Sequence, residues 1–312
     1  MMYKKRTERA KSCAPNQGAI NMWNHIPILA SEIADLLLTN PQGTYMDGTL
    51  GLGGHTKLFL SKLAPQARIF GFDKDPQALQ MAVERVKDTR LVPCHASYTQ
   101  APEVLAAHGV TQLDGALFDL GLSSYQLDDP TRGFSLLREG PLDMRFDPTQ
   151  TLTAGEIVNT WPLSELARIF QDYGEERRAQ QAAHAVVSAR RTSPIETTFQ
   201  LKQVLEPALG PQRGRIHPAT RIFQALRIAC NQELEQVRQI GQMLARILKP
   251  GARAAVLTFH SLEDRLIKNE FKALVASGGW QLVNKHTLVP SRQEISQNSR
   301  ARSAKLRVIE RI

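Results

Sequence analysis

The chain has 312 residues, of which 42% are hydrophobic and 22% charged, a balance typical of a globular protein. No apolar run reaches the ~20 residues that a transmembrane helix needs, which excludes an integral membrane protein of that type. Lysine and arginine number 39 against 30 aspartates and glutamates, and the net charge of +9 favours a polyanionic partner.

The first 24 residues are basic and lack the apolar segment of a secretory signal, so we expect them to form a disordered extension. The three cysteines, Cys13, Cys94 and Cys230, are far apart and form no C-x-x-C pair. This spacing argues against a disulfide framework or a zinc site and fits a reducing cytoplasm. We therefore expect a cytoplasmic protein with no bound metal.

Short apolar runs alternate with helix-like stretches in the first part of the chain. The pattern predicts strands at 44–47, 68–73, 91–95 and 115–119, with helices at 54–63 and 76–87. Pro76 suits the first position of its helix. Strands that alternate with helices indicate βαβ units and a parallel sheet.

The pattern changes after residue 123. Residues 123–162 are rich in turn signals, and residues 163–191 and a segment around 201–209 have the apolar spacing of helices. The alternation then returns, with helices at 233–248 and 263–275 and strands at 254–259, 280–284 and 305–311. We predict an α/β fold: a Rossmann-like sheet domain, 25–123 and 228–312, interrupted by an all-helical insert at 124–227.

A glycine-rich loop follows the first predicted strand. Gly51 and Gly53 match two glycines of the dinucleotide fingerprint, but Thr56 occupies the third position and no Walker lysine follows. The loop begins with Asp47, whose carboxylate suits a ligand with an ammonium group, such as the methionine part of S-adenosylmethionine. The same carboxylate would repel a pyrophosphate, which disfavours an NAD-dependent enzyme.

Two further carboxylates end predicted strands. Asp73 ends the second strand, where an acid can accept both hydroxyls of a ribose, whereas Asp75 suits the N-cap of the next helix. Asp119 ends the fourth strand, where a carboxylate or backbone carbonyl can accept a hydrogen bond from a substrate amine and align it with an electrophilic methyl group. No cysteine is placed for methylation of a ring carbon, since Cys94 lies in a predicted strand.

Much of the chain falls into blocks of specific sequence. They are HIPIL at 25–29, DGTLGLGGH at 47–55, DLGLSSYQLD at 119–128, RGFS at 132–135, GPLDMR at 140–145, YGEE at 173–176, HPATR at 217–221, FHSLEDR at 259–265 and SAKLR at 303–307. In this order the blocks resemble the MraW family, the 16S ribosomal RNA cytosine-N4 methyltransferases. The resemblance extends over nearly everything from His25 onward.

This resemblance implies a class I methyltransferase that uses S-adenosylmethionine and forms N4-methylcytidine at a decoding-centre cytosine of 16S ribosomal RNA within the small subunit. It implies that the insert recognises the RNA. The cofactor positions carry over to Gly53, Gly54, His55, Asp73, Tyr98, Asp119 and Gln126. Tyr98 replaces a phenylalanine of many relatives. Ser299 stands where the family usually has proline, and the C-terminal stretch is shorter than in many relatives.

Asp119, Ser123 and His260 are the candidate catalytic residues. Ser123 either caps a helix or contacts the target base. His260 follows the fifth predicted strand and either lines the target pocket or has a structural role. His25 is likewise either structural or part of the substrate site.

The candidate substrate-binding residues each have a structural alternative. Arg132 and Arg145 suit a phosphate, although Arg145 can instead pair with Asp143 to hold its loop. Phe134 either stacks on the target base or lies in the core. His217 and Arg221 begin a predicted helix and either bind a phosphate there, beside Arg215, or simply cap the helix.

Two functions of other classes remain open. One is methylation of a protein or a small molecule, which predicts no transfer to ribosomal particles. The other is a non-catalytic RNA-binding assembly factor, which predicts no affinity for S-adenosylmethionine. The sequence leaves open whether the chain forms a homodimer.

Overall fold

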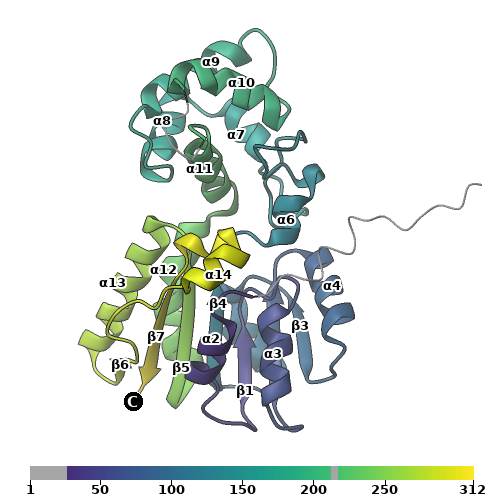
Figure 1. Cartoon of the computed structure of the whole chain (residues 1–312), viewed down its shortest axis with the longest axis vertical. Helices are drawn as coiled ribbons and strands as arrows, with labels where there is room; N and C mark the ends of the chain where they lie inside the picture. The colour runs from purple at the N-terminus through teal and green to yellow at the C-terminus, as the bar shows by residue number, and fades with distance from the viewer. Residues whose placement is uncertain (1–26, 212–216) are drawn as a thin grey trace, which may run out of the picture.

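Seven strands form one sheet in the computed structural model, which describes residues 27–211 and 217–312 (Figure 1). The strands are β1 (Thr44–Asp47), β2 (Arg68–Asp73), β3 (Leu91–His95), β4 (Leu113–Asp119), β5 (Leu248–Thr258), β6 (Trp280–Leu282) and β7 (Lys305–Arg311). Their order is β3-β2-β1-β4-β5-β7-β6, with β7 antiparallel to both neighbours and the other pairs parallel. The predicted α/β fold with a Rossmann-like sheet is confirmed.

Helices cover both faces of this sheet. Those on one face are α2 (Ala30–Leu37), α3 (Gly54–Lys62) and α4 (Pro76–Val86), and those on the other are α5 (Ala101–Ala107), α12 (Glu233–Ile247) and α13 (Ser261–Ser277). The central strand β4 supplies both cores, because Ala116 and Phe118 belong to the core that includes residues of α12, whereas Leu117 belongs to the core that includes residues of α2 and α3. A parallel strand that is buried on both faces has a continuous apolar run, as this strand does.

A second group of helices lies between β4 and β5 in the chain and stands beyond one end of the sheet (Figure 1). They are α6 (Ser124–Asp128), α7 (Ala154–Thr160), α8 (Leu163–Asp172), α9 (Ala179–Arg190), α10 (Thr198–Leu209) and α11 (Thr220–Asn231), with a 3₁₀ turn η2 (Pro130–Arg132). Phe170, Leu201 and Leu226 belong to a hydrophobic core that is separate from the cores of the sheet. We call residues 124–231 the helical region.

Three predicted segments differ markedly from the structure, and others only at their ends. The single helix expected at 163–191 is two helices, α8 and α9, with a break between them in which Glu175 adopts a left-handed conformation (φ 48°). The strand expected at 254–259 begins at Leu248 and pairs with Leu113 there. The turn-rich residues 123–162 contain α6, η2 and α7.

The sequence did not predict several short elements outside the helical region. Helices α2, α5 and α14 (Arg292–Gln297), and the 3₁₀ turns η1 (Tyr98–Gln100) and η3 (Ser299–Ser303), belong to this group. The α14–η3 segment packs on the sheet domain, since Glu294 accepts a hydrogen bond from the backbone N–H of Leu29 (2.8 Å). Over the described ranges, no helix is long and apolar enough to cross a membrane.

Candidate active site

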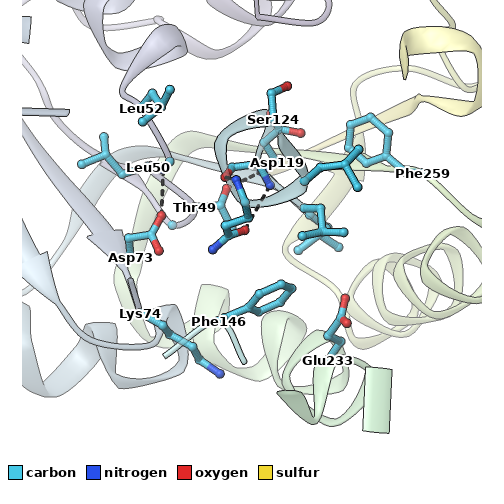
Figure 2. A pocket seen from close by; sticks show the side chains of 18 of the residues that line it. Thr49, Leu50, Leu52, Asp73, Lys74, Asp119, Ser124, Phe146, Glu233 and Phe259 are labelled. Atoms are coloured by element: carbon cyan, nitrogen blue, oxygen red, sulfur yellow. Dashed lines mark hydrogen bonds between the residues drawn. The ribbon is translucent and has the colours of Figure 1, made fainter. Parts of the chain in front are cut away.

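A cavity of about 630 Å³ lies where the carboxyl ends of β1, β2 and β4 meet the helical region. Figure 2 shows Asp73, Asp119, Phe146 and Glu233 around it. The strand order reverses between β1 and β4, and open parallel sheets bind ligands at the carboxyl ends of strands beside such a point. The cavity has the size of small-molecule and cofactor sites, which span roughly 300–1,000 Å³.

The glycine-rich loop after β1 forms one wall of the cavity. Gly51 (φ 50°) and Gly53 (φ 69°) adopt left-handed conformations, which glycine allows without steric cost. The backbone N–H of Gly51 donates to Asp73 Oδ2 (2.8 Å), so the loop is held against the end of β2. Gly51 and Gly54 line the cavity, whereas Gly53 is the N-cap of α3 and is not part of the lining.

Asp73 lines the cavity with a carboxylate that already accepts two backbone hydrogen bonds. Its Oδ1 accepts from the N–H of Asp75 (2.9 Å), and Oδ2 accepts from Gly51. Burial raises the pKa of Asp73 to about 6, against the opposing effect of these hydrogen bonds. Asp75 caps α4 by accepting from the N–H of Gln77 (3.0 Å), as predicted. Asp73 is therefore left free of the capping role and faces the cavity.

Asp119 is held in place at the end of β4. Its backbone N–H donates to Thr49 Oγ1 (2.6 Å), and its Oδ2 lies 3.7 Å from His55 Nδ1. Burial raises the pKa of Asp119 to about 7, and the nearby charge of Glu263 adds to this effect. Its Oδ1 is buried and has no hydrogen-bond partner within residues 27–211 and 217–312. An unpaired buried acceptor is unusual in a native protein, and a ligand N–H would satisfy it.

Asp47 does not face the cavity, contrary to our expectation. It is 2% exposed and is absent from the cavity lining. Its carboxylate accepts from Thr56 Oγ1 (2.7 Å) and from the N–H of Thr49 (3.3 Å). Asp47 therefore orders the loop. The strand-end carboxylates that line the cavity are those of Asp73 and Asp119.

The other predicted cofactor residues line the cavity but are also engaged in the fold. His55 is buried, with Nε2 3.0 Å from the carbonyl oxygen of Ile28. The Tyr98 ring packs edge-on against Phe118, with centroids 5.3 Å apart. Gln126 donates from Nε2 to Asp75 Oδ2 (3.3 Å). The structure thus brings these three side chains to one cavity.

Ser123 and His260 both act as helix caps. Ser123 Oγ accepts from the N–H of Gln126 (3.2 Å) at the start of α6, although the residue also lines the cavity. His260 Nδ1 accepts from the N–H of Glu263 (3.4 Å) at the start of α13, and its Nε2 lies 3.0 Å from Glu263 Oε1. His260 does not line the cavity, so it cannot contact a ligand there directly.

Phe259 and Glu263 reach the cavity from this turn, and neither was among the predicted site residues. Glu263 Oε2 accepts from the N–H of Phe259 (2.8 Å), and the Glu263 side chain is 1% exposed. Burial alone would raise the pKa of Glu263, but the contact with His260 and the positive charge of Arg227 outweigh burial and hold it below the usual value. A glutamate three residues after an N-cap is the sequence signature of a capping box and could have identified it.

Arg132 and Phe134 are buried in the helical region rather than exposed to substrate. Arg132 Nη1 lies 2.5 Å from Asp75 Oδ2, and its Nη2 donates to the carbonyl oxygens of Arg145 (2.9 Å) and Phe146 (3.0 Å). Phe134 is 6% exposed and stacks against Phe146, with ring centroids 5.7 Å apart. Phe134 therefore has the core position that was its structural alternative, and within the helical region the ring that lines the cavity is that of Phe146.

The other three predicted substrate residues also have partners within the protein. Arg145 pairs with Asp143 through Nε (2.9 Å) and Nη2 (2.7 Å), the structural alternative considered above. His217 Nε2 lies 3.3 Å from Glu206 Oε1, and Arg221 Nη1 donates to the carbonyl oxygen of Glu175 (3.2 Å). None of the five predicted substrate residues lines the cavity. His25, Arg215 and the predicted extension 1–24 lie outside the described residues.

Charged residues that the sequence analysis did not select occupy the side of the cavity opposite the glycine-rich loop. Arg227 of α11 pairs with Glu233 of α12 through two short contacts, Nε to Oε1 (2.8 Å) and Nη2 to Oε2 (2.9 Å). Burial lowers the pKa of Lys74, and the carboxylates of Glu233 and Asp147 oppose this effect.

The described part of the chain contains no group of three or more His, Cys, Asp or Glu side chains that could hold a metal ion.

Comparisons with known proteins agree with the resemblance. A family model described as the MraW methylase family matches residues 22–312. The chain is 53% identical over 294 residues to Ribosomal RNA small subunit methyltransferase H of Elusimicrobium minutum, covering 94% of this chain and 100% of that protein. It is 44% identical over 306 residues to the protein of the same name from Thermomicrobium roseum, covering 92% of this chain and 94% of that protein.

Solved structures show weaker similarity. A putative rRNA-methylase from Clostridium thermocellum has 12% sequence identity and a TM-score of 0.43, with 91% of this chain and 95% of that chain covered. A putative methyltransferase from Streptococcus mutans in complex with SAH has 14% identity and a TM-score of 0.38, with the same coverage of 91% and 95%.

Proposed function

This chain belongs to the MraW methylase family of S-adenosylmethionine-dependent methyltransferases, and we propose that it methylates the exocyclic N4 of a decoding-centre cytosine in 16S ribosomal RNA. The names of its relatives support a substrate in the small ribosomal subunit. The single structural observation that carries the proposal is the unpaired buried Oδ1 of Asp119 at the cavity. This oxygen accepts no hydrogen bond from the described residues, and the amine of a substrate has N–H groups that can donate to it.

The residues of the cavity fit S-adenosylmethionine. Asp73 retains acceptor capacity for ribose hydroxyls, because each carboxylate oxygen has two lone pairs and each accepts one backbone hydrogen bond. Tyr98 offers an apolar ring for the adenine, and Asp119 a carboxylate near the loop of Gly51 and Gly54. When bound, the cofactor supplies an electrophilic methyl group on its sulfonium.

Asp119 is the residue that acts on the nucleophile. The exocyclic amine of cytosine is a weak nucleophile because its lone pair is delocalised into the ring. The Asp119 carboxylate accepts a hydrogen bond from this amine and orients it, and it can take up the proton that the amine loses after transfer. Thr49 fixes the backbone at Asp119, so the carboxylate has little freedom to move away.

The helical region supplies the opposite wall of the cavity. Phe146 is only partly buried and can stack on a base that has left its own helix, the role first considered for Phe134. Glu233 and Arg227 can bond to the polar edges of that base. We therefore propose that residues 124–231 hold the RNA around the target nucleotide. This assignment places the enzyme in the cytoplasm, where small ribosomal subunits are present.

The experiment that tests this function uses labelled S-adenosylmethionine. The protein is incubated with unmodified small ribosomal subunits and, separately, with naked 16S RNA, and the products are digested to nucleosides for mass spectrometry. We expect label in N4-methylcytidine, and the comparison shows which assembly state is used. Asp119→Ala should abolish transfer while the fold persists, and its affinity for the cofactor is measured separately. Label in protein alone, or no label despite cofactor binding, would contradict the proposal.

A further inference from the structure

Two arginines from distant parts of the chain meet at one carboxylate beside the cavity. Arg300 of η3 donates from Nη2 to Asp128 Oδ1 (3.0 Å). Arg138 donates from Nη1 to the backbone carbonyl of the same Asp128, and its Nη2 lies 3.9 Å from Oδ1. Asp128 ends α6, whose residues Ser124, Gln126 and Leu127 line the cavity, as does Arg300 itself.

This cluster is open to solvent. The exposed fractions of the Arg138, Asp128 and Arg300 side chains are 52%, 41% and 38%. Ion pairs at such exposure contribute little to the stability of a fold, so exchanging the carboxylate for another anion costs little. A guanidinium has five N–H donors, and within the described residues Arg300 uses one of them. Both arginines can therefore bind a second anion.

Three other basic residues near the C-terminus, Lys305, Arg307 and Arg311, are committed elsewhere. Lys305 and Arg307 both pair with Asp264, at 3.0 and 2.8 Å. Arg311 donates to the backbone carbonyl oxygens of Ala245, near the end of α12, and Leu248, at the start of β5. Arg300 is thus the member of this basic segment that borders the cavity.

We propose that Arg138 and Arg300 form a clamp for a backbone phosphate of the RNA strand that enters the cavity, with Asp128 holding the two guanidinium groups in place until the phosphate replaces it. The inference rests on the proposed function, because it assumes an RNA substrate. A nucleotide that reaches the cavity must leave its helix, which brings its own phosphates to the cavity mouth. Arginine is suited to this contact because its planar N–H groups match two phosphate oxygens.

The test compares three variants with a matched control. Arg138→Ala and Arg300→Ala each remove one side of the clamp, and Asp128→Asn removes the competing charge while it keeps the size of the side chain. Arg246→Ala is the control, because Arg246 is also exposed (59%) and paired, with Glu103 at 3.0 Å, but does not line the cavity. The probe is the unmodified small ribosomal subunit, and its affinity is measured over a range of salt concentrations.

We expect Arg138→Ala and Arg300→Ala each to weaken subunit binding roughly three- to tenfold, which corresponds to the loss of about one hydrogen bond to phosphate. Each should also reduce the slope of log affinity against log salt by about 0.7–0.9. Asp128→Asn should bind as tightly as the wild type or more tightly, and Arg246→Ala should be unchanged. Affinity for S-adenosylmethionine should stay at the wild-type value throughout.

Two results would overturn the clamp. If Asp128→Asn weakens binding as much as Arg300→Ala does, the cluster is a latch between α6 and η3 and not a phosphate site. If the two arginine variants match Arg246→Ala, no phosphate is bound there. Because the measurement is of binding, it gives an answer even if the wild type forms no N4-methylcytidine, an outcome that would overturn only the proposed function.

Discussion

Arg132 Nη1 lies 2.5 Å from Asp75 Oδ2, in an ion pair that joins the helical region to the helix cap beside the cofactor cavity. The two side chains are 9% and 0% exposed, and the residues are 57 positions apart in the sequence. Asp75 is also hydrogen-bonded to Gln126 and, through its backbone N–H, to Asp73. The cap of α4 therefore connects the cavity wall with the segment that leads into the helical region.

Replacing Arg132 should reveal this connection. Arg132→Ala leaves the buried Asp75 carboxylate without its ion-pair partner, which typically costs about 3–5 kcal/mol of unfolding free energy. We also expect weaker S-adenosylmethionine binding, because Asp73 is held through the backbone of Asp75. Chemical denaturation and calorimetric titration measure the two effects.

The control for that variant is Arg168→Ala, which breaks the exposed pair with Glu165. Exposed pairs of this kind contribute about 0–1 kcal/mol, so the control should differ little from the wild type. Equal losses in both variants would contradict the special position of the Arg132–Asp75 pair.

The pKa of Asp119 predicts how the rate of methyl transfer depends on pH. Burial and the charge of Glu263 raise this pKa from its usual 3.8 to about 7, so the carboxylate is protonated below that pH in the folded enzyme. If the ionised form receives the amine, the rate should fall as pH decreases through about 7 and level off above it. Single-turnover rates between pH 5.5 and 9 test this dependence, and a flat profile would argue against Asp119.

Asp119→Asn separates this catalytic role from a structural one. The variant cannot take up a proton, so we expect a rate loss of about 10²–10⁴-fold. Its stability at pH 8 should be no lower than that of the wild type. The raised pKa means that this carboxyl destabilises the native state increasingly as pH rises from about 4 to about 7, with the full cost present above pH 7, and the neutral amide removes that cost. Thermal denaturation at pH 8 and pH 6 measures the difference.

Glu263 and His260 should affect the enzyme in different ways. Glu263→Gln removes a negative charge near Asp119, so the acid limb of the pH–rate profile should move to lower pH. His260→Ala removes the N-cap of α13, which costs about 0.5–2 kcal/mol of stability, and His260→Asn should restore most of it. An unmoved acid limb in Glu263→Gln would show that its charge does not act on Asp119.

Substitutions of the two stacked rings should have different effects: that of Phe134 on stability, and that of Phe146 on RNA recognition. Phe134→Ala opens a cavity in the core of the helical region and should cost about 3–5 kcal/mol of stability. Phe146→Leu keeps apolar contact but removes the aromatic face at the cavity, so we expect a raised KM for ribosomal subunits with near-normal cofactor affinity. An unchanged KM would exclude Phe146 as a base contact.

The sequence determined the sheet and the places of its strand ends. The bounds of β1, β2, β3 and β7 agree with the predicted ranges, because their apolar runs and flanking turn residues are local signals. Parallel strands end at one edge, so the sequence alone is enough to expect Asp73 and Asp119 at the same cavity. The β5 strand was predicted too short, since Lys249, Pro250 and Gly251 carry the signals of a helix stop.

Tertiary packing decided which side chains face the cavity. Asp47 and Asp119 both end strands, yet only Asp119 lines the site, because Thr56 and Thr49 hold the Asp47 carboxylate inside the loop. Phe146 took the cavity position expected of Phe134, and Glu263 that of His260. Contacts with residues nearby in the sequence set the orientations of Asp47 and Glu263, whereas Phe146 is held by distant neighbours such as Asn231, whose Oδ1 accepts a hydrogen bond from the N–H of Phe146. Residue type and spacing carry no information about those neighbours, and only the folded structure brings them together.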